Sequence, residues 1–221
     1  MATRIKICGV RTPAIAACAS DAGADAIGLV FYPPSVRAVS VEQAETVIQA
    51  TAPLVTVVGL FVDPTVEEVS KVLESCAIDC LQFHGNESAE FCEQFRRPYL
   101  KAIAMRPDVD VAASVKAHPR ARAYLFDAWS ASMPGGTGKT FVWERLPALE
   151  QPWLLAGGLD AGNIESAIVK VRPSAVDVSG GVECRPGEKC PDLLKEFIGV
   201  VRRADQVLAE CDLDNRHGRR P

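Results

Sequence analysis

Residues 4–31 read RIKICGVRTPAIAACASDAGADAIGLVF, which gives a strand, an amphipathic helix and a second strand in succession. The β-type residues of Arg4–Cys8 and Asp25–Phe31 indicate the two strands. Between them, Thr12 and Pro13 supply a helix cap and a first-turn proline. Strands that alternate with helices in this way are typical of a parallel sheet with helical crossovers.

This alternation continues along the chain without a linker or a change in composition. Further strands are expected at Leu54–Phe61, Asp79–Phe83, Tyr99–Ala104, Ala123–Asp127, Trp153–Ala156 and Ala175–Ser179. Further helices are expected at Val41–Thr51, from Asp63-Pro64, at Glu87–Phe95, Val109–Ala117, near Trp143, at Asn163–Val171 and from about Cys190.

Eight strand–helix units with right-handed crossovers close naturally into a barrel. We therefore predict the α/β class, with a single-domain (β/α)₈ TIM barrel over residues 1–204. Residues 205–221 form a polar tail that we expect to fray. The alternative is an open doubly wound sheet, but no G-x-G-x-x-G motif follows the first strand.

Composition limits the classes of partner. The chain has 221 residues, 48% of them hydrophobic, and a formal net charge of −4. Because no basic stripe is present, nucleic acid is not an expected partner. No apolar run approaches the roughly 18 residues that cross a membrane. Residues 1–11 do not resemble a secretory signal, so we expect a cytoplasmic protein.

The chain contains eight cysteines: Cys8, Cys18, Cys76, Cys80, Cys92, Cys184, Cys190 and Cys211. None belongs to a C-x-x-C pair, which disfavours a zinc site or a thioredoxin-like redox site. A reducing cytosol keeps such thiols free. Most are expected to be small buried hydrophobes or surface thiols, and we predict neither a metal nor a cofactor.

The carboxyl ends of the strands carry the functional hypothesis, because barrels of this kind place their sites there. The positions where strands pass into loops include Cys8, Asp63, His84 and Asp127. A thiol, a carboxylic acid and a histidine on one rim indicate an enzyme.

Glycine turns end the seventh and eighth strands, as Gly157-Gly158 and Ser179-Gly180-Gly181. Glycine lets backbone N–H groups approach an anion closely, and these two loops form the usual phosphate site of the fold. One glycine pair could simply make a tight turn. Two pairs at these two strands favour phosphate binding.

Cys8 can serve as a base or a nucleophile once it is ionised, although a packed thiol is the plain alternative. Side chains alternate along a strand, so Lys6 should face the barrel interior with Cys8, where its ammonium would favour the thiolate. Asp177, on the neighbouring eighth strand, should also face inward. We predict a Lys6–Asp177 ion pair, which would satisfy two buried charges and dilute the effect on Cys8.

Three further side chains are candidates for the site. Asp127 follows an apolar run, and apolar surroundings favour the neutral acid that a general acid needs, although Asp also caps loops. Arg37, after the second strand, can hold a carboxylate with two hydrogen bonds, or can be solvated. His84 can contact a ligand or simply pack, and no accompanying ligand residue indicates a metal.

The loop that follows the sixth strand contains PGGTGKT at residues 134–140 and superficially resembles a P-loop. Its spacing is too short and it follows the wrong strand, so ATP binding is disfavoured. A mobile lid over the site is the better interpretation.

Together these motifs resemble the phosphoribosylanthranilate isomerase family. The matching stretches are Lys6-Ile7-Cys8-Gly9, Phe31-Tyr32-Pro33 with Ser35 and Arg37, Gly59-Leu60-Phe61-Val62, Gln82-Phe83-His84-Gly85, residues 135–141, residues 155–159 with Asn163, and residues 177–183. They run in the family's order from Lys6 to about Phe197, which is nearly the whole chain. Each motif alone is weak, but the set is specific.

The resemblance implies a rearrangement of N-(5-phosphoribosyl)anthranilate to 1-(2-carboxyphenylamino)-1-deoxyribulose 5-phosphate in tryptophan biosynthesis. It implies that Asp127 protonates the ribose ring oxygen and that Cys8, as thiolate, removes the C2′ proton. Arg37 would bind the anthranilate carboxylate, and backbone groups near Gly158 and residues 179–181 would hold the phosphate. The partner would thus be a small molecule with phosphate and carboxylate groups, and no cofactor or metal is implied.

Three positions depart from the family pattern. Ser179-Gly180-Gly181 stands where two serines usually precede the glycine, so a hydroxyl contact is lost while a backbone grip survives. Phe141-Val142-Trp143 stands where Phe-Asp-Trp is frequent, and Phe83 replaces a usual leucine.

Two other functions compete with this hypothesis. An indole-glycerol-phosphate synthase would carry catalytic lysine and glutamates on its early strands, whereas here the first strand ends in Cys8. A non-catalytic phosphosugar-binding barrel would not need both Cys8 and Asp127. The oligomeric state stays undetermined.

Overall fold

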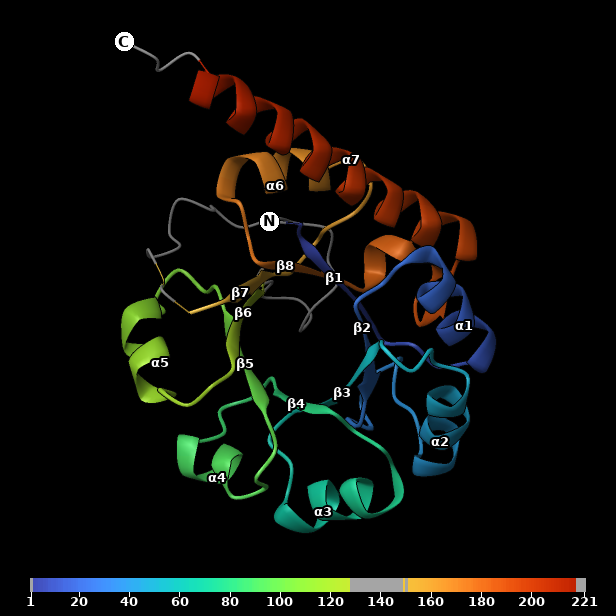
Figure 1. Ribbon diagram of the computed structural model, residues 1–221. Helices are drawn as coiled ribbons and strands as arrows, with labels where there is room; N and C mark the ends of the chain where they lie inside the picture. Colours follow the sequence, from blue (N-terminus) through green and yellow to red (C-terminus); the bar gives the residue numbers. More distant parts are fainter. Residues whose placement is uncertain (1, 128–148, 150, 218–221) are drawn as a thin grey trace.

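The computed structural model describes residues 2–127, 149 and 151–217, with side chains for all of these except residues 212–217. Within this part of the chain, eight parallel strands form a closed barrel in the order β1 to β8, and β8 pairs with β1 (Figure 1). The strands are β1 Arg4–Cys8, β2 Ala26–Val30, β3 Thr56–Phe61, β4 Cys80–Phe83, β5 Tyr99–Ala104, β6 Ala123–Asp127, β7 Trp153–Leu155 and β8 Ala175–Val178. The predicted TIM barrel is confirmed.

Helices surround the barrel on its outside (Figure 1). They are α1 Pro13–Ala22, α2 Val41–Gln49, α3 Val66–Ser75, α4 Ala89–Glu93, α5 Val111–Ala117, α6 Ile164–Val171 and α7 Pro191–His217. After β8 come a 3₁₀ turn, Gly180–Val182, and a hairpin of β9, Glu183–Arg185, with β10, Glu188–Lys189. The helix expected near Trp143 and the lid expected at residues 135–140 lie outside the described residues.

Capping residues fix where the helices begin. Thr12 accepts a hydrogen bond from the backbone N–H of Ile15 and caps α1, as predicted. The third helix begins at Val66, later than the sequence suggested, because Thr65 and Glu68 form a reciprocal capping box. The third strand likewise begins late, and Leu54 is left 97% exposed in the preceding loop.

Alternation of side chains along the strands separates two apolar layers. Ile5 and Ile7 point outward into the main core between strands and helices, whereas Lys6 and Cys8 of the same strand face the barrel interior. The interior is filled by Val58, Cys80, Leu100, Ala102, Ala123, Leu125, Leu154 and Ala156. A further small cluster of Cys8, Val30 and Leu60 follows toward the carboxyl end of the strands.

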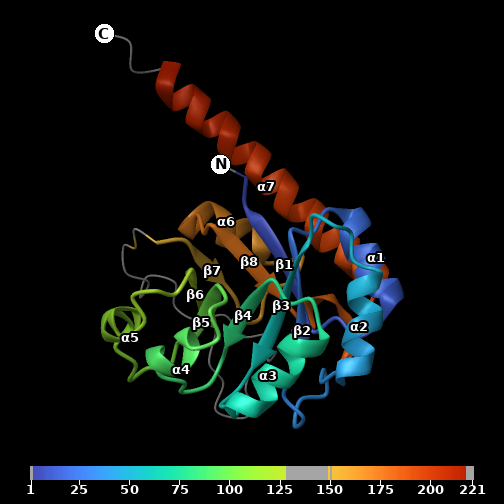
Figure 2. The ribbon, with the colours of Figure 1, turned by 60° about the horizontal axis from the view of Figure 1, so that its bottom comes forward.

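The last helix, α7, ties the amino terminus to the barrel and then extends beyond it (Figure 2). The hydroxyl of Thr3 donates to Asp205 at 2.6 Å, and Arg202 donates to the carbonyl of Thr3 at 2.7 Å. The helix runs on through residue 205, where the polar tail was expected to begin, to His217. The division of the chain at residue 204 stays a prediction.

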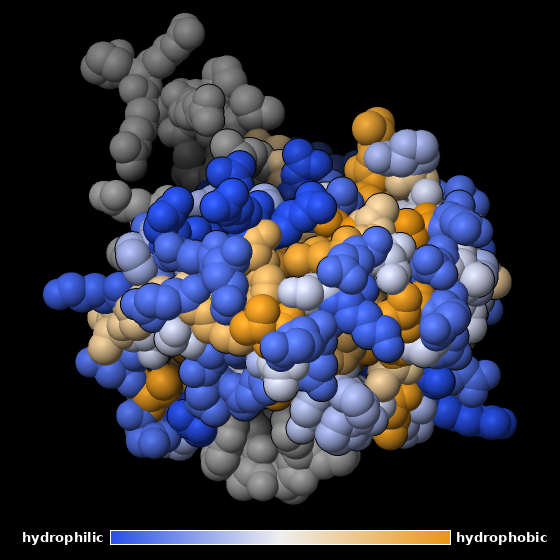
Figure 3. All heavy atoms as spheres, turned by 90° about the horizontal axis from the view of Figure 1, so that it is seen from below, coloured by the Kyte–Doolittle hydropathy of each residue, from blue (hydrophilic) through white to orange (hydrophobic). Residues whose placement is uncertain are grey.

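The outer face around α3 is mostly hydrophilic, with smaller hydrophobic patches between the polar side chains (Figure 3). Val66, Leu73 and Phe95 line a shallow hollow between α3 and α4. Across the residues described, none of the helices combines the length and apolar character that crossing a membrane requires.

Candidate active site

The carboxyl ends of the barrel strands bring the candidate residues to one rim. Cys8 is the last residue of β1 and Asp127 is the last residue of β6. Because every neighbouring pair of barrel strands is parallel, both residues lie at the same end of the barrel. The arrangement that the sequence predicts for this pair of residues is therefore present.

Cys8 is held in a buried corner between β1, β2 and β8. Its side chain packs with Val30 and Leu60, and the residue is only 6% exposed. Below it, the ammonium of Lys6 lies 2.8 Å from Oδ1 of Asp177, with both side chains buried. The Lys6–Asp177 ion pair predicted from the sequence is confirmed.

The pKa of Cys8 shows the expected opposition of Lys6 and Asp177, with burial as a larger cause that the sequence did not indicate. Burial raises the pKa of the Cys8 thiol above its usual value; Lys6 opposes this effect, and Asp177 adds to it. Burial also acts to lower the pKa of Lys6, but Asp177 and Cys8 reverse this and raise it, so Lys6 stays charged. Lys6 favours the thiolate as predicted, yet burial outweighs it, and the pKa of the thiol stays above its ordinary value.

Gly28 on β2 makes room for this corner, and the sequence analysis missed it. A Cβ atom at Gly28 would lie 3.0 Å from Nζ of Lys6 and 3.1 Å from Sγ of Cys8. Both distances are tighter than ordinary van der Waals contact, so any larger residue would displace the ammonium or the sulfur. A glycine inside a strand pattern is a recognised signal of such a close approach.

Asp127 is held by a chain of side-chain hydrogen bonds from β4. Nε2 of His84 lies 3.1 Å from Oδ2 of Asp127, and Nε2 of Gln82 lies 3.1 Å from Nδ1 of His84. The amide of Gln82 donates to Nδ1, which assigns the ring proton to Nε2, where it is donated to Asp127. Gln82 was part of a recognised motif, but no role followed from the sequence.

The loop after His84 is fixed by a buried ion pair. Lys101 donates to Glu87 at 2.7 Å and to the carbonyl of Gly85 at 2.6 Å. Glu87 in turn accepts from the backbone N–H groups of Gly85 and Asp63. All of these bonds end within the loops after β3 and β4, so the network holds the backbone beside His84 in place.

The glycine turns after β7 and β8 lie in direct contact. Gly157 and Gly158 both have positive φ angles, 87° and 64°, and a Cβ atom on Gly181 would overlap the carbonyl oxygen of Leu159. Among the described residues, the N–H groups of Gly157, Gly158, Gly180 and Gly181 find no acceptor. Free N–H groups on two touching turns can hold an anion.

Arg37 is neither solvated nor remote from the eighth strand. Its Nε and Nη2 donate to the two carboxylate oxygens of Glu183 at 2.7 and 2.8 Å. Its aliphatic stem packs so closely on Gly9 that a Cβ atom there would lie 2.7 Å from Cδ of Arg37. Glu183, which follows the turn after β8, therefore joins that turn to the loop that carries Arg37.

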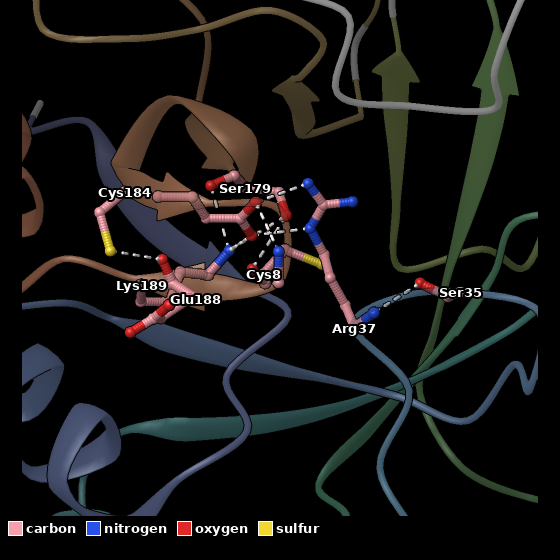
Figure 4. A network of polar contacts seen from close by, with 9 residues as sticks. Cys8, Ser35, Arg37, Ser179, Cys184, Glu188 and Lys189 are labelled. Atoms are coloured by element: carbon pink, nitrogen blue, oxygen red, sulfur yellow. Dashed lines mark hydrogen bonds and ion pairs between the residues drawn. The ribbon is translucent and has the colours of Figure 1, made fainter.

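The hairpin that carries Glu183 also contacts the Cys8 corner (Figure 4). Lys189 donates to Glu183 at 2.6 Å, to the carbonyl of Ser179 at 3.0 Å and to its hydroxyl at 3.2 Å. The Ser179 hydroxyl donates to the carbonyl of Cys8 at 3.1 Å. The sequence analysis gave no role to Glu183 or Lys189, although Pro186-Gly187 between them is a recognised turn signal.

Electrostatics keep this hairpin carboxylate ionised. Burial alone would raise the pKa of Glu183, but hydrogen bonds from Arg37 and the charge of Lys189 lower it to about 2. Glu183 in turn raises the pKa of Arg37 above its ordinary value. Burial lowers the pKa of Lys189, and Glu183 opposes this effect through its charge and a hydrogen bond of 2.6 Å. With Lys189 protonated in this contact, the group carries two cations and one anion.

The Cys8 and Asp127 corners lie within electrostatic reach of each other. Burial raises the pKa of Asp177 and Lys6 lowers it, while the charges of Asp127 and His84 also act on it. Asp177 thus interacts with groups from both corners. No cluster of His, Cys, Asp and Glu that could hold a metal ion occurs in the described part of the chain.

Comparison with known proteins identifies the family. A model of the N-(5′-phosphoribosyl)anthranilate isomerase family matches residues 5–200. The chain belongs to this family. An N-(5′-phosphoribosyl)anthranilate isomerase of Pseudomonas fluorescens is 48% identical over 208 residues, which cover 94% of this chain and 99% of the relative.

Solved structures of phosphoribosylanthranilate isomerases agree with this assignment. The enzyme from Thermotoga maritima superposes with a TM-score of 0.81 at 35% identity, covering 90% of this chain and 98% of its own. Another, in complex with reduced 1-(o-carboxyphenylamino)-1-deoxyribulose 5-phosphate, gives a TM-score of 0.77 at 33% identity, with the same coverage of both chains. The resemblance read from the motifs is confirmed, and the chain is an isomerase of tryptophan biosynthesis.

Proposed function

We propose that this chain converts N-(5-phosphoribosyl)anthranilate to 1-(2-carboxyphenylamino)-1-deoxyribulose 5-phosphate, with Asp127 as general acid and Cys8 as general base. The observation that carries these roles is the position of the two side chains: a carboxylic acid and a thiol end two strands at one rim of the barrel. The solved relative that holds a reduced product of this kind supports the same substrate class.

The reaction divides into two proton transfers. Protonated Asp127 gives its proton to the ribose ring oxygen, the C1′–O bond breaks, and the nitrogen lone pair forms a protonated Schiff base. The Cys8 thiolate then removes the proton from C2′, and the electrons of that C–H bond neutralise the Schiff base to an enolamine. The enolamine relaxes to the ketone. Each acid–base step contributes about 10²–10⁴-fold to the rate.

The surroundings of each group suit its part. His84 donates to one oxygen of Asp127, which leaves the other oxygen to carry the proton toward the substrate. Burial raises the pKa of Cys8, which favours the neutral thiol in the free protein. The thiol therefore gives its proton to solvent before it acts as base, and the cationic Schiff base that forms after ring opening, together with Lys6, stabilises the resulting thiolate.

The two charged ends of the substrate have matching groups. Arg37 offers its guanidinium to the anthranilate carboxylate, and His84 lies beside the ribose. Backbone N–H groups of Gly157, Gly158, Gly180 and Gly181, with Ser179 at the start of the second turn, hold the phosphate. The chemistry needs no cofactor.

We further propose that the protein works in the cytoplasm. All eight cysteines are free thiols, and four of them are buried, as a reducing compartment allows. Its partner is the small phosphorylated substrate.

The decisive experiment compares Cys8→Ala and Asp127→Asn with wild type. We expect kcat for phosphoribosylanthranilate, followed by fluorescence, to fall by about 10²–10⁴-fold in each variant. Binding of reduced 1-(o-carboxyphenylamino)-1-deoxyribulose 5-phosphate, measured by calorimetry, should persist. Cys211→Ala and Asp108→Asn, at exposed positions, are the matched controls.

The outcomes separate the competing functions. A wild-type kcat in Cys8→Ala would contradict the base assignment. Binding of the analogue without turnover by the wild-type protein would indicate a phosphosugar-binding barrel that does not catalyse.

A further inference from the structure

The hairpin of β9 and β10, residues 183–189, has no role in the acid–base chemistry, yet it contacts the loop that carries Arg37 at two places. Glu183 holds the guanidinium of Arg37 through two hydrogen bonds. At the tip, a Cβ atom on Gly187 would lie 2.7 Å from the carbonyl oxygen of Val36. The N–H of Gly187 also donates to Glu183 at 3.0 Å, which links the two contacts.

Glu183 occupies one edge of the Arg37 guanidinium, and this determines which hydrogen-bond donors are left for a ligand. Nε and Nη2 donate to Glu183, and within the described residues Nη1 makes no hydrogen bond. Figure 4 shows the remaining edge of the guanidinium pointing away from the hairpin. A planar guanidinium held by one edge presents the other edge in a fixed direction.

Charge gives a second, independent argument for an anionic ligand. Glu183 and Lys189 have side chains that are 4% and 1% exposed, and that of Arg37 is 18% exposed. Two cations and one anion leave this nearly buried group with one positive charge in excess. Buried charges are normally paired, so a carboxylate on the ligand would complete the group.

Lys189 extends the same group toward the base. It bonds to Glu183 and to both oxygens of Ser179, and the Ser179 hydroxyl bonds to the carbonyl of Cys8. One lysine therefore joins the carboxylate that holds Arg37 to the turn beside Cys8.

We propose that Glu183 and Lys189 are positioning residues that determine the carboxylate specificity of the site: Glu183 fixes the direction of the Arg37 guanidinium, and Lys189 fixes Glu183 against Ser179. This inference rests on the proposed contact between Arg37 and the anthranilate carboxylate. Glu183 touches no reacting atom. It acts through Arg37, so its loss affects recognition of the carboxylate more than the proton transfers.

The test is Glu183→Gln, which keeps the size of the side chain and removes its charge. We expect KM for phosphoribosylanthranilate and the inhibition constant of anthranilate to rise about tenfold, the size of one charge-assisted hydrogen bond. The inhibition constant of inorganic phosphate and kcat should change less than about twofold. Glu188→Gln, an exposed glutamate on the same hairpin, is the matched control and should leave all four values unchanged.

A double-mutant cycle with Arg37→Met separates the two hypotheses. If Arg37→Met leaves the anthranilate constant unchanged, the proposed carboxylate contact fails. If Arg37→Met weakens anthranilate but Glu183→Gln does not, only the present inference is overturned. We expect Glu183→Gln to add nothing in the Arg37→Met background, and full additivity would contradict the proposal.

Removing Glu183 leaves Lys189 buried without a carboxylate, so Glu183→Gln can fail to fold. In that case Glu183→Gln/Lys189→Met, which removes one charge of each sign, replaces it in the cycle. The expected weakening of anthranilate is the same. Anthranilate inhibition at the wild-type level in the folded double variant overturns the inference.

Discussion

The base and the acid of the site stand in opposite kinds of surroundings. Cys8 lies among charged side chains, with Lys6 and Asp177 beneath it and the Lys189–Glu183 pair beside it. Asp127 instead ends a chain of hydrogen bonds through His84 to Gln82. An ion pair, Lys101 with Glu87, also lies on the Asp127 side of the barrel, but its hydrogen bonds go to the backbone of the loops after β3 and β4.

The difference shows how one barrel rim prepares two groups for opposite tasks. A thiol that must lose its proton only during turnover is placed where a cation favours the thiolate and burial opposes it. A carboxylic acid that must give a proton is aligned by a histidine that donates to one of its oxygens. We call the surroundings of Cys8, with Lys6 and Asp177, the charged corner, and those of Asp127, with His84 and Gln82, the hydrogen-bonded corner. The stability of the protein should therefore fall strongly when a charge is lost from the charged corner. It should change little when a residue of the hydrogen-bonded corner is replaced by one of similar volume.

The largest effect expected from this comparison is the loss of stability in Lys6→Met. The substitution leaves the Asp177 carboxylate buried without its partner, which costs about 3–5 kcal/mol of the free energy of unfolding. Denaturant titration of the variant measures this value. Lys6→Met/Asp177→Leu removes both charges and should be clearly more stable than the single variant.

A matched control lies on the same strand. Arg4 pairs with Asp25, but its side chain is 74% exposed, so Arg4→Met should cost less than about 1 kcal/mol. If Lys6→Met and Arg4→Met lose the same free energy of unfolding, burial does not make the Lys6–Asp177 pair more important for stability than the exposed Arg4–Asp25 pair.

The second effect concerns pH. Because burial raises the pKa of Cys8 above its ordinary value of 9.0, the free protein should hold a neutral thiol at pH 8. The folded protein then binds the proton more tightly than the unfolded chain, so this group lowers stability as pH rises above about 9. The thiolate absorbance at 240 nm, taken as the difference between wild type and Cys8→Ser, should appear only above pH 9. A full thiolate signal at pH 7 would contradict the raised pKa of Cys8.

The sequence predicts the parts of the site that depend on strand periodicity. Alternation along β1 and β8 places Lys6 and Asp177 inside the barrel, and closure makes these strands neighbours, so the ion pair follows. The contact of Arg37 with Glu183 has no such periodicity. It arises where two loops far apart in the chain meet, and it depends on Gly9 and Gly187, whose absent side chains allow close packing. The net protonation of Cys8 also escapes prediction, because it is a balance of burial against several charges.

The smallest effect on stability is expected at the hydrogen-bonded corner, in Gln82→Met. Gln82 is fully buried, and no partner for its Oε1 occurs within the described residues, so methionine of similar volume removes an unsatisfied polar atom along with one hydrogen bond. We expect the free energy of unfolding to stay within about 1 kcal/mol of wild type. Activity should change more, since His84 loses the donor that keeps its proton toward Asp127, and kcat should fall about fivefold for a bond worth about 1 kcal/mol.

Gln49→Met, at an exposed position of α2, controls for the change of residue type and should alter neither value. Denaturant titration and the fluorescence assay measure both effects on the same samples. If Gln82→Met loses as much stability as Lys6→Met, the hydrogen-bonded corner is as sensitive to substitution as the charged corner, and the proposed difference between them is wrong. An unchanged kcat would show that His84 aligns Asp127 without Gln82, because the hydrogen bond from Nε2 would then persist on its own.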